Sequence, residues 1–133
     1  MAQTVWNLPV PSTALLSGAA FHQLLGRTCA LAGEYEDDDD NVVSLKMLFE
    51  GVEAFKCTHD TAVTVEMIET AYDQVADLGS TEWLTQIESQ LVSSRKDAKG
   101  LRHLMIYFDV GPCYEFICRS FRTEEKIDRK ISL

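Results

Sequence analysis

The sequence predicts an α+β fold in which an antiparallel sheet is packed by two helices. Two segments, at 42–50 and 102–122, alternate apolar and polar residues with the period of a half-buried strand. Between these segments, apolar residues recur at the spacing of an amphipathic helix. This order of strands, two helices and a hairpin is typical of the α+β class.

The composition bounds the kind of protein that the chain can be. Its 133 residues suit one ordinary domain, predicted to span 1–133. Hydrophobic residues make up 46% and charged residues 25%, which excludes a disordered chain. The 12 basic and 21 acidic residues give a net charge of −9, which repels phosphates, so we expect no nucleic-acid partner. No apolar run reaches the roughly 18–20 residues that cross a bilayer, so no membrane partner is expected.

The cysteine pattern bears on compartment and on metal binding. The residues before Arg27 include no Lys or Arg, so nothing resembles the basic start of a secretory signal. We therefore expect a cytoplasmic protein with free thiols, most of them packing residues. The spacing contains no Cys-x-x-Cys pair, and neither a metal nor a cofactor is predicted. The four cysteines are Cys29, Cys57, Cys113 and Cys118.

The first half of the chain is predicted to hold an arm and three strands. Residues 1–20, which contain two of the three prolines, indicate an extended N-terminal arm or short strand. The stretch 21–35 fits either a helix or a strand, because short apolar runs do not separate the two periods. At Glu50–Gly51 the alternation breaks, either at a tight hairpin turn or at a bulge. The predicted strands lie at 28–35, 42–50 and 52–59.

Two helices are predicted over 65–78 and 81–92. Thr64 is the expected N-cap of the first, and Gly79 suits the residue after its end. Ser80 is then expected to cap the second helix. The following segment, 93–100, is predicted to be a loop.

A hairpin is predicted from strands at 102–109 and 113–122. A three-residue loop at 110–112 would align the apolar faces, with Phe108 opposite Tyr114, Ile106 opposite Phe116, and Leu104 opposite Cys118. Met105 and Ile117 lie on the opposite face, which is therefore not expected to be wholly solvated. The same face carries a candidate polar patch, formed by His103, Tyr107, Glu115 and Arg119. This row fits either a binding surface or ordinary cross-strand pairs. The rest of the chain, 123–133, is predicted to be a charged tail.

An acidic loop is the most prominent local feature. Its carboxylates crowd together between two predicted strands, which favours an exposed loop. An EF-hand starting at Asp37 would need Gly and Glu where the chain has Val42 and Leu48, so a calcium loop is not predicted. We expect the loop to contact a basic partner protein. Its candidate residues are Glu34, Glu36, Asp37, Asp38, Asp39 and Asp40.

Cys57 and His59 form the most reactive-looking pair. At positions i and i+2 of a strand they would point the same way, which could supply half a metal site or a thiol beside a base. The two residues would lie nearly 7 Å apart along a strand, and the sequence contains no second pair of potential ligands with matching spacing. Both observations favour a packing role for Cys57. The sequence contains no nucleotide-binding loop and no hydrolase or zinc-protease motif, so no catalytic residue is predicted.

Three stretches resemble a group of small uncharacterised bacterial proteins. These are Leu45–Val52, Ala71–Leu84, and Leu101–Ile117, and the likeness covers about residues 42–122. The matching residues belong to strand alternation, a helix boundary and a hairpin, so the resemblance implies a fold and no catalytic group. In size and charge the chain also resembles immunity proteins of contact-dependent toxin systems.

The charge is unevenly spread along the sequence. Residues 1–94 hold 3 basic and 15 acidic residues, whereas 95–133 hold 9 basic and 6 acidic residues. This favours a non-catalytic protein-binding module that acts through an acidic surface. Two alternatives stay open. One is an enzyme or small-ligand protein that uses Cys57 and His59 or His103 and Tyr107, and the other is a homo-oligomeric structural subunit that pairs through a sheet edge or the Met105/Ile117 face.

Overall fold

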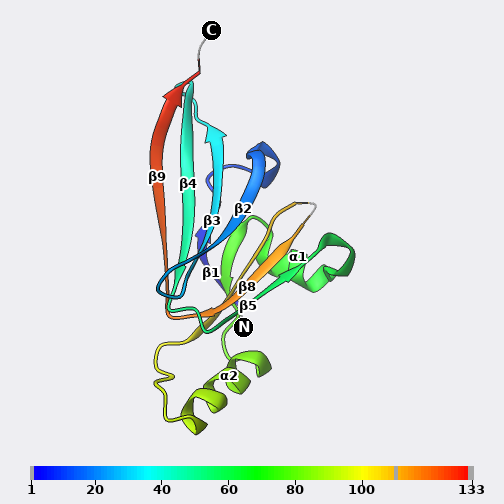
Figure 1. Ribbon diagram of the computed structural model, residues 1–133. Helices are drawn as coiled ribbons and strands as arrows, with labels where there is room; N and C mark the ends of the chain where they lie inside the picture. Colours follow the sequence, from blue (N-terminus) through cyan, green and yellow to red (C-terminus); the bar gives the residue numbers. More distant parts are fainter. Residues whose placement is uncertain (1, 110, 132–133) are drawn as a thin grey trace.

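The computed structural model describes residues 2–109 and 111–131 (Figure 1). Within these ranges the chain forms two antiparallel sheets and two α-helices, which confirms the α+β class. Two sheets replace the single sheet that the sequence predicted. The alternating pattern identifies half-buried strands, but it does not tell which strands share a sheet.

The four-stranded sheet has the order β2 (Leu16–Leu24), β3 (Thr28–Glu36), β4 (Asn41–Glu50) and β9 (Ser120–Lys130). The strands predicted at 28–35 and 42–50 are confirmed, and the ambiguous stretch before them is also a strand. The segment 1–20, predicted as an extended arm or short strand, contains a strand of the other sheet at Gln3–Asn7 and already enters β2. Most of the predicted tail is β9, because backbone pairing with β4 runs from Ser120 to Lys130 and does not require apolar side chains.

The five-stranded sheet has the order β1 (Gln3–Asn7), β6 (Gln74–Asp77), β7 (Arg102–Tyr107), β8 (Cys113–Cys118) and β5 (Ala54–Thr58). All of its strand pairs are antiparallel. The strand predicted at 52–59 is confirmed as the shorter β5.

The chain passes between the two sheets three times, after β1, after β4 and after β8, and the last two of these crossings are neighbours. Glu50–Gly51 is neither a hairpin turn nor a bulge, because β4 ends in one sheet and β5 begins in the other. Gly51 has a φ of +64°, and a Cβ there would lie 3.0 Å from the Cβ of Arg119. The strand predicted over 113–122 likewise divides at Arg119 into β8 and β9. Both crossings therefore meet at one junction.

The helices differ in length from the prediction. Helix α1 spans Val65–Ala71, and Thr64 caps it as predicted by accepting the Met67 N–H at 3.2 Å. The remainder of the predicted helix forms β6, because pairing with β1 and β7 overrides a short helical pattern. Helix α2 spans Glu82–Ser93, and its N-cap is Thr81 rather than Ser80.

The hairpin of β7 and β8 forms with a register two residues away from the predicted one. Leu104 lies opposite Phe116 and Ile106 lies opposite Tyr114, so the predicted pairs are wrong. A longer turn over 108–112 replaces the three-residue loop, and its Val110 lies outside the described residues. Side chains alternate with a period of two, so the apolar pattern cannot separate registers that differ by two residues. The predicted inward face is correct, since Leu104, Ile106 and Phe116 are fully buried.

The main core lies between the two sheets. Phe49 of β4 and Phe116 of β8 stack at its centre, with ring centroids 3.9 Å apart and an interplanar angle of 16°. The other face of the five-stranded sheet is covered by the helices, as the apolar Met105 and Ile117 suggested. Met105 packs in one cluster with Ala71 of α1, and Ile117 packs in another with Leu84 of α2.

Neither α-helix of the described chain is long and apolar enough to span a membrane.

Candidate functional site

The predicted acidic loop forms the end of the β3–β4 hairpin. In Figure 1 this end lies far from α2, at the opposite extreme of the four-stranded sheet. Four of the loop's carboxylates are exposed, and we call them the acidic tip. The acidic tip consists of Glu36, Asp38, Asp39 and Asp40.

Asp37 has a different role, because it holds the loop together. Its Oδ1 accepts the backbone N–H groups of Asp39 and Asn41, both at 2.9 Å, and its Oδ2 accepts the Asn41 amide at 3.0 Å. The backbone hydrogen bond from Asn41 is the largest cause that lowers the pKa of Asp37. Asp37 is therefore an ionised structural residue of the loop.

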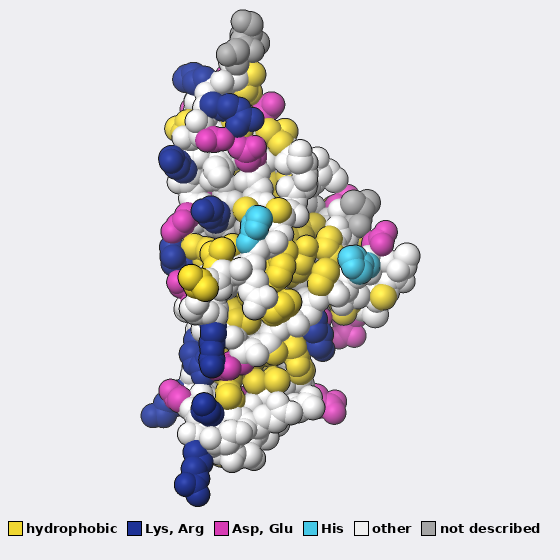
Figure 2. Space-filling view, in the orientation of Figure 1, with side chains coloured by type: hydrophobic (Ala, Val, Ile, Leu, Met, Phe, Trp, Pro, Cys, Tyr) yellow, Lys and Arg dark blue, Asp and Glu magenta, His cyan; other side chains and the backbone are white. Residues whose placement is uncertain are grey.

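Basic residues of β9 lie beside the loop. Arg129 donates to Glu34 at 3.2 Å, so Glu34 is an ion-paired strand residue outside the acidic tip. Lys130 lies opposite Asn41 on the neighbouring strand. Figure 2 shows both signs of charge together at this upper end of the molecule. The acidic and basic parts of the sequence thus meet in space, and the acidic surface is smaller than the sequence predicted.

The predicted polar patch is not an exposed surface. His103 and Glu115 are 4% and 5% exposed and are covered by α2. The Nε2 atom of His103 lies 2.8 Å from Glu115 Oε1, and its Nδ1 lies 2.7 Å from the Thr81 hydroxyl. Trp83 packs edge-on against the His103 ring at 5.1 Å between centroids. These contacts form a buried network that joins the N-terminus of α2 to the sheet.

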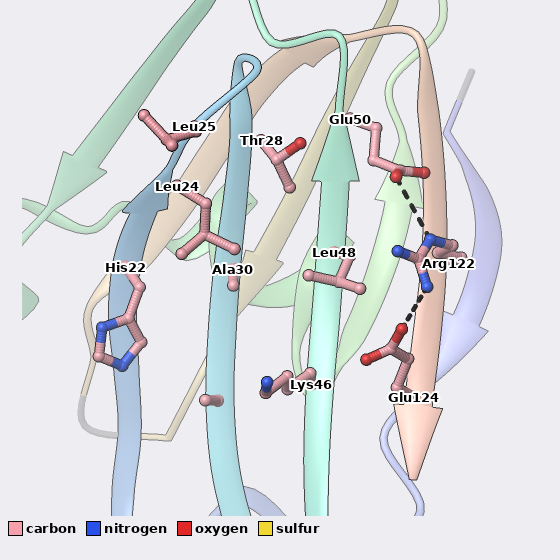
Figure 3. Close-up of a pocket in the computed structure, with 11 residues that line it drawn as sticks. His22, Leu24, Leu25, Thr28, Ala30, Lys46, Leu48, Glu50, Arg122 and Glu124 are labelled. Atoms are coloured by element: carbon pink, nitrogen blue, oxygen red, sulfur yellow. Dashed lines mark hydrogen bonds and ion pairs between the residues drawn. The ribbon is translucent and has the colours of Figure 1, made fainter.

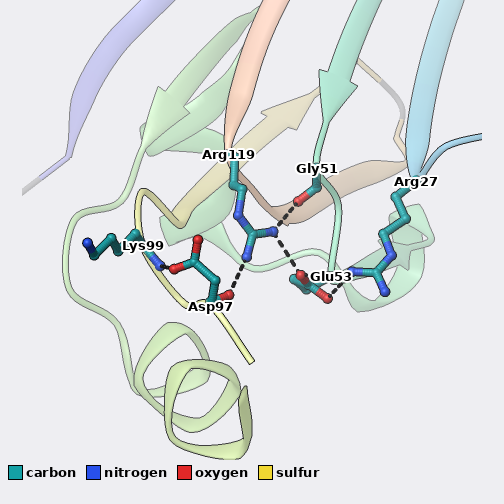
Figure 4. Close-up of polar contacts among 6 residues, drawn as sticks. All are labelled: Arg27, Gly51, Glu53, Asp97, Lys99 and Arg119. Carbon is teal, nitrogen blue, oxygen red and sulfur yellow. Dashed lines mark hydrogen bonds and ion pairs between the residues drawn. The ribbon is translucent and has the colours of Figure 1, made fainter. Parts of the chain in front are cut away.

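The other two patch residues lie elsewhere. Tyr107 is buried beneath α1, in the cluster that contains Ala71. Arg119 stands at the junction of the sheets, where it donates to Glu53 at 2.8 Å and to the carbonyl of Asp97 at 2.6 Å (Figure 4). Its guanidinium also donates to the Gly51 carbonyl at 3.2 Å. Arg119 therefore fixes both crossings, and the residue opposite His103 is Ile117.

Cys57 and His59 both lie at the surface, at one edge of the five-stranded sheet. Both are exposed, Cys57 on the edge strand β5 and His59 just beyond it. Across the described ranges, no three His, Cys, Asp or Glu side chains gather in a way that could hold a metal ion. Cys57 is exposed, so the prediction that it packs is wrong, whereas Cys29, Cys113 and Cys118 are buried.

Sequence reasoning missed Thr81 and Trp83. Thr81 is the N-cap of α2 and Trp83 lies in its first turn, and their contacts with His103 depend on how that helix docks on the sheet. A threonine before a helical pattern is an N-cap signal, so the cap could have been found. Its hydrogen bond to a histidine of β7, 22 residues along the chain, leaves no local signal.

No protein-family model matches the chain. No curated protein and no solved structure matches it either. The resemblance to small bacterial proteins accordingly stays a prediction.

The four thiols are expected to differ sharply in reactivity. Burial raises the pKa of Cys113 and Cys118 to about 12, and it raises the pKa of Cys29 as well. At pH 8 we therefore expect Ellman's reagent to modify Cys57 rapidly in the folded protein and all four cysteines in guanidinium chloride. Cys57→Ser should abolish the rapid phase. Rapid modification of two or more thiols in the native wild type would contradict this assignment.

Proposed function

We propose that the protein is a non-catalytic protein-binding module that captures a basic partner through its acidic tip. The main supporting observation is that four exposed carboxylates stand together at the end of the β3–β4 hairpin, three of them on a loop whose backbone is fixed by Asp37. A loop that is ordered before binding loses less conformational entropy when a partner docks. Lysine and arginine side chains of a partner would supply the matching charge.

The electrostatic surroundings of the acidic tip support this role. The protein as a whole carries −9, so a basic partner is attracted at long range and then meets the exposed carboxylates. Salt screens such attraction beyond about 8 Å at physiological ionic strength. Binding through the tip should accordingly be fast at low salt and much slower at high salt.

A non-catalytic role is also favoured by where the candidate reactive groups lie. Cys57 and His59 are exposed at the edge of the five-stranded sheet, whereas His103 is buried beneath α2. An inhibitor of a basic toxin would act through such an acidic surface alone, in keeping with the resemblance in size and charge to immunity proteins.

The test replaces Asp38, Asp39 and Asp40 together by asparagine. Asparagine keeps the side-chain shape and tolerates the φ of +60° at position 40. The wild type is first used at low salt to capture binding proteins from the native host. We expect a captured protein to associate about tenfold more slowly with the triple variant than with the wild type. The measurement is surface plasmon resonance with the purified captured protein, from 50 mM to 500 mM NaCl.

A matched control removes the same charge elsewhere. The triple variant Glu66→Gln, Glu69→Gln and Glu88→Gln changes three carboxylates on α1 and α2. It should leave the association rate within about twofold of the wild type, because only the distant net charge changes. Binding through the acidic tip would be refuted if both triple variants lowered the association rate equally. It would also be refuted if the association rate did not change with salt concentration.

A further inference from the structure

The free edge of the four-stranded sheet is a second surface, separate from the acidic tip. In the order β2-β3-β4-β9, strand β2 pairs with β3 on one side only, within the part of the chain that the structure describes. Residues Ala20 to Leu24 pair with β3 one by one, so this half of β2 is regular. An edge strand of this kind presents backbone N–H and C=O groups that can pair with another strand.

The composition of β2 leaves this edge unprotected. The chain from Ala2 to Gly26 contains no Lys, Arg, Asp or Glu, and β2 contains no proline. The opposite edge of the same sheet is β9, whose sequence SFRTEEKIDRK is dominated by charged residues. Natural sheets use charged side chains and proline to block pairing at edges. One edge of this sheet is therefore protected by charge, whereas the regular half of β2, from Ala20 to Leu24, is not.

Exposed leucines lie along the unprotected edge, at one end of a groove. Leu24 is 47% exposed and Leu25, in the following turn, is 97% exposed. Both line one end of a groove of about 460 Å³ on the outer face of the sheet, next to Ala30 and Leu48. The far end of the groove is lined by charged side chains of β4 and β9, namely Lys46, Glu50, Arg122 and Glu124. Figure 3 shows Leu24 standing beside Ala30 on this face, with Leu48 on the next strand. Exposed leucines beside such a groove indicate a surface that another chain covers.

We propose that β2 pairs antiparallel with β2 of a second copy of this chain, about a two-fold axis at His22. The two four-stranded sheets would then join into one continuous eight-stranded sheet. In this register Ala20 lies opposite Leu24 of the second copy, so a small side chain meets a large one on the outer face. His22, Ala20 and Leu24 share that face, because they pair with Ala30, Ala32 and Thr28 of β3.

Charge is the reason for choosing a second copy as the occupant. Two molecules that each carry −9 repel one another, so they can associate closely only where neither surface is charged. The edge of β2 meets this condition, and an antiparallel strand pair is self-complementary about a two-fold axis. A basic partner, by contrast, would find no carboxylate along β2 to pair with.

The first experiment is sedimentation equilibrium of the full chain from 1 to 500 μM. We expect a monomer–dimer equilibrium, with the mass rising from 14.9 kDa towards twice that value. Leu24→Glu should raise the dimer dissociation constant about tenfold or more, because it places a charge on the pairing edge. Ile127→Glu is the matched control, since Ile127 is 60% exposed on β9 and the change in net charge is the same. Circular dichroism would verify that both variants fold.

The second experiment tests the register. In a Cys57→Ser background, His22→Cys should form an intermolecular disulfide on mild oxidation, because paired antiparallel residues have Cα atoms about 4.5–5.5 Å apart. Lys126→Cys on the opposite edge, in the same background, should not form one. Three results would each overturn the proposal. The first is a monomer at every concentration, and the second is an equal weakening of the dimer by Leu24→Glu and Ile127→Glu. The third is a dimer that His22→Cys fails to cross-link.

Discussion

Phe116→Ala is expected to lower the free energy of unfolding by about 3–5 kcal/mol. Phe116 is fully buried and stacks on Phe49 at 3.9 Å between ring centroids, so it joins the two sheets at their closest aromatic contact. Alanine would leave a cavity that neither sheet can close, because each is held by its own backbone pairing. Urea denaturation followed by circular dichroism would measure the loss.

Phe55→Ala supplies the matched control. Phe55 lies directly opposite Phe116 on the neighbouring strand, but its side chain is 41% exposed. The same truncation should therefore cost about 1 kcal/mol or less. Comparable losses in the two variants would show that the stacked pair is not the main link between the sheets.

Glu115→Ala is expected to have the second largest effect, a loss of about 3–5 kcal/mol. The substitution leaves His103 buried without the carboxylate that lies 2.8 Å from its Nε2 atom. A buried polar group that loses its partner keeps the full cost of its desolvation. The His103 ring also bonds to Thr81, the cap of α2, so the helix should loosen from the sheet. Urea denaturation measures the loss, and hydrogen exchange of the α2 amides would detect the loosening.

Glu115→Gln separates the hydrogen bond from the rest of the effect. The amide oxygen of glutamine can still accept from His103, so this variant should lose clearly less stability than Glu115→Ala. Exchange protection of α2 should stay close to that of the wild type. If glutamine and alanine are equally destabilising, the network depends on the carboxylate charge rather than on an acceptor.

Side-chain alternation accounts for the parts of the fold that the sequence predicted correctly. Strands β3 and β4 are one example, and the inward face of the β7–β8 hairpin is another. The parts that were missed depend on pairing between distant segments. Strand β6 looks like the end of a helix until β1 and β7 flank it, and β9 looks like a solvated tail until β4 lies beside it. A local sequence pattern does not reveal which distant segments will lie beside β6 and β9.

The candidate site was predictable to a similar extent. Crowded carboxylates predicted an exposed loop, and the acidic tip is exposed as expected. The separate role of Asp37 follows from backbone geometry, which composition does not reveal. The prediction of an exposed polar patch was wrong for a related reason. The burial of His103 and Glu115 depends on where α2 docks. Arg119 was assigned to the wrong place because the chain changes sheets at that residue.

The pairing of β4 with β9 also has a consequence for synthesis of the protein. Glu50 lies opposite Ser120, which is 70 residues later, and Asn41 lies opposite Lys130. A ribosome that adds about 5–20 residues each second needs several seconds to make the chain between them. During this interval β3 and β4 can form a hairpin, but the outer edge of β4 stays open. The nascent chain is therefore most exposed to aggregation, and most in need of a chaperone, just before β9 emerges.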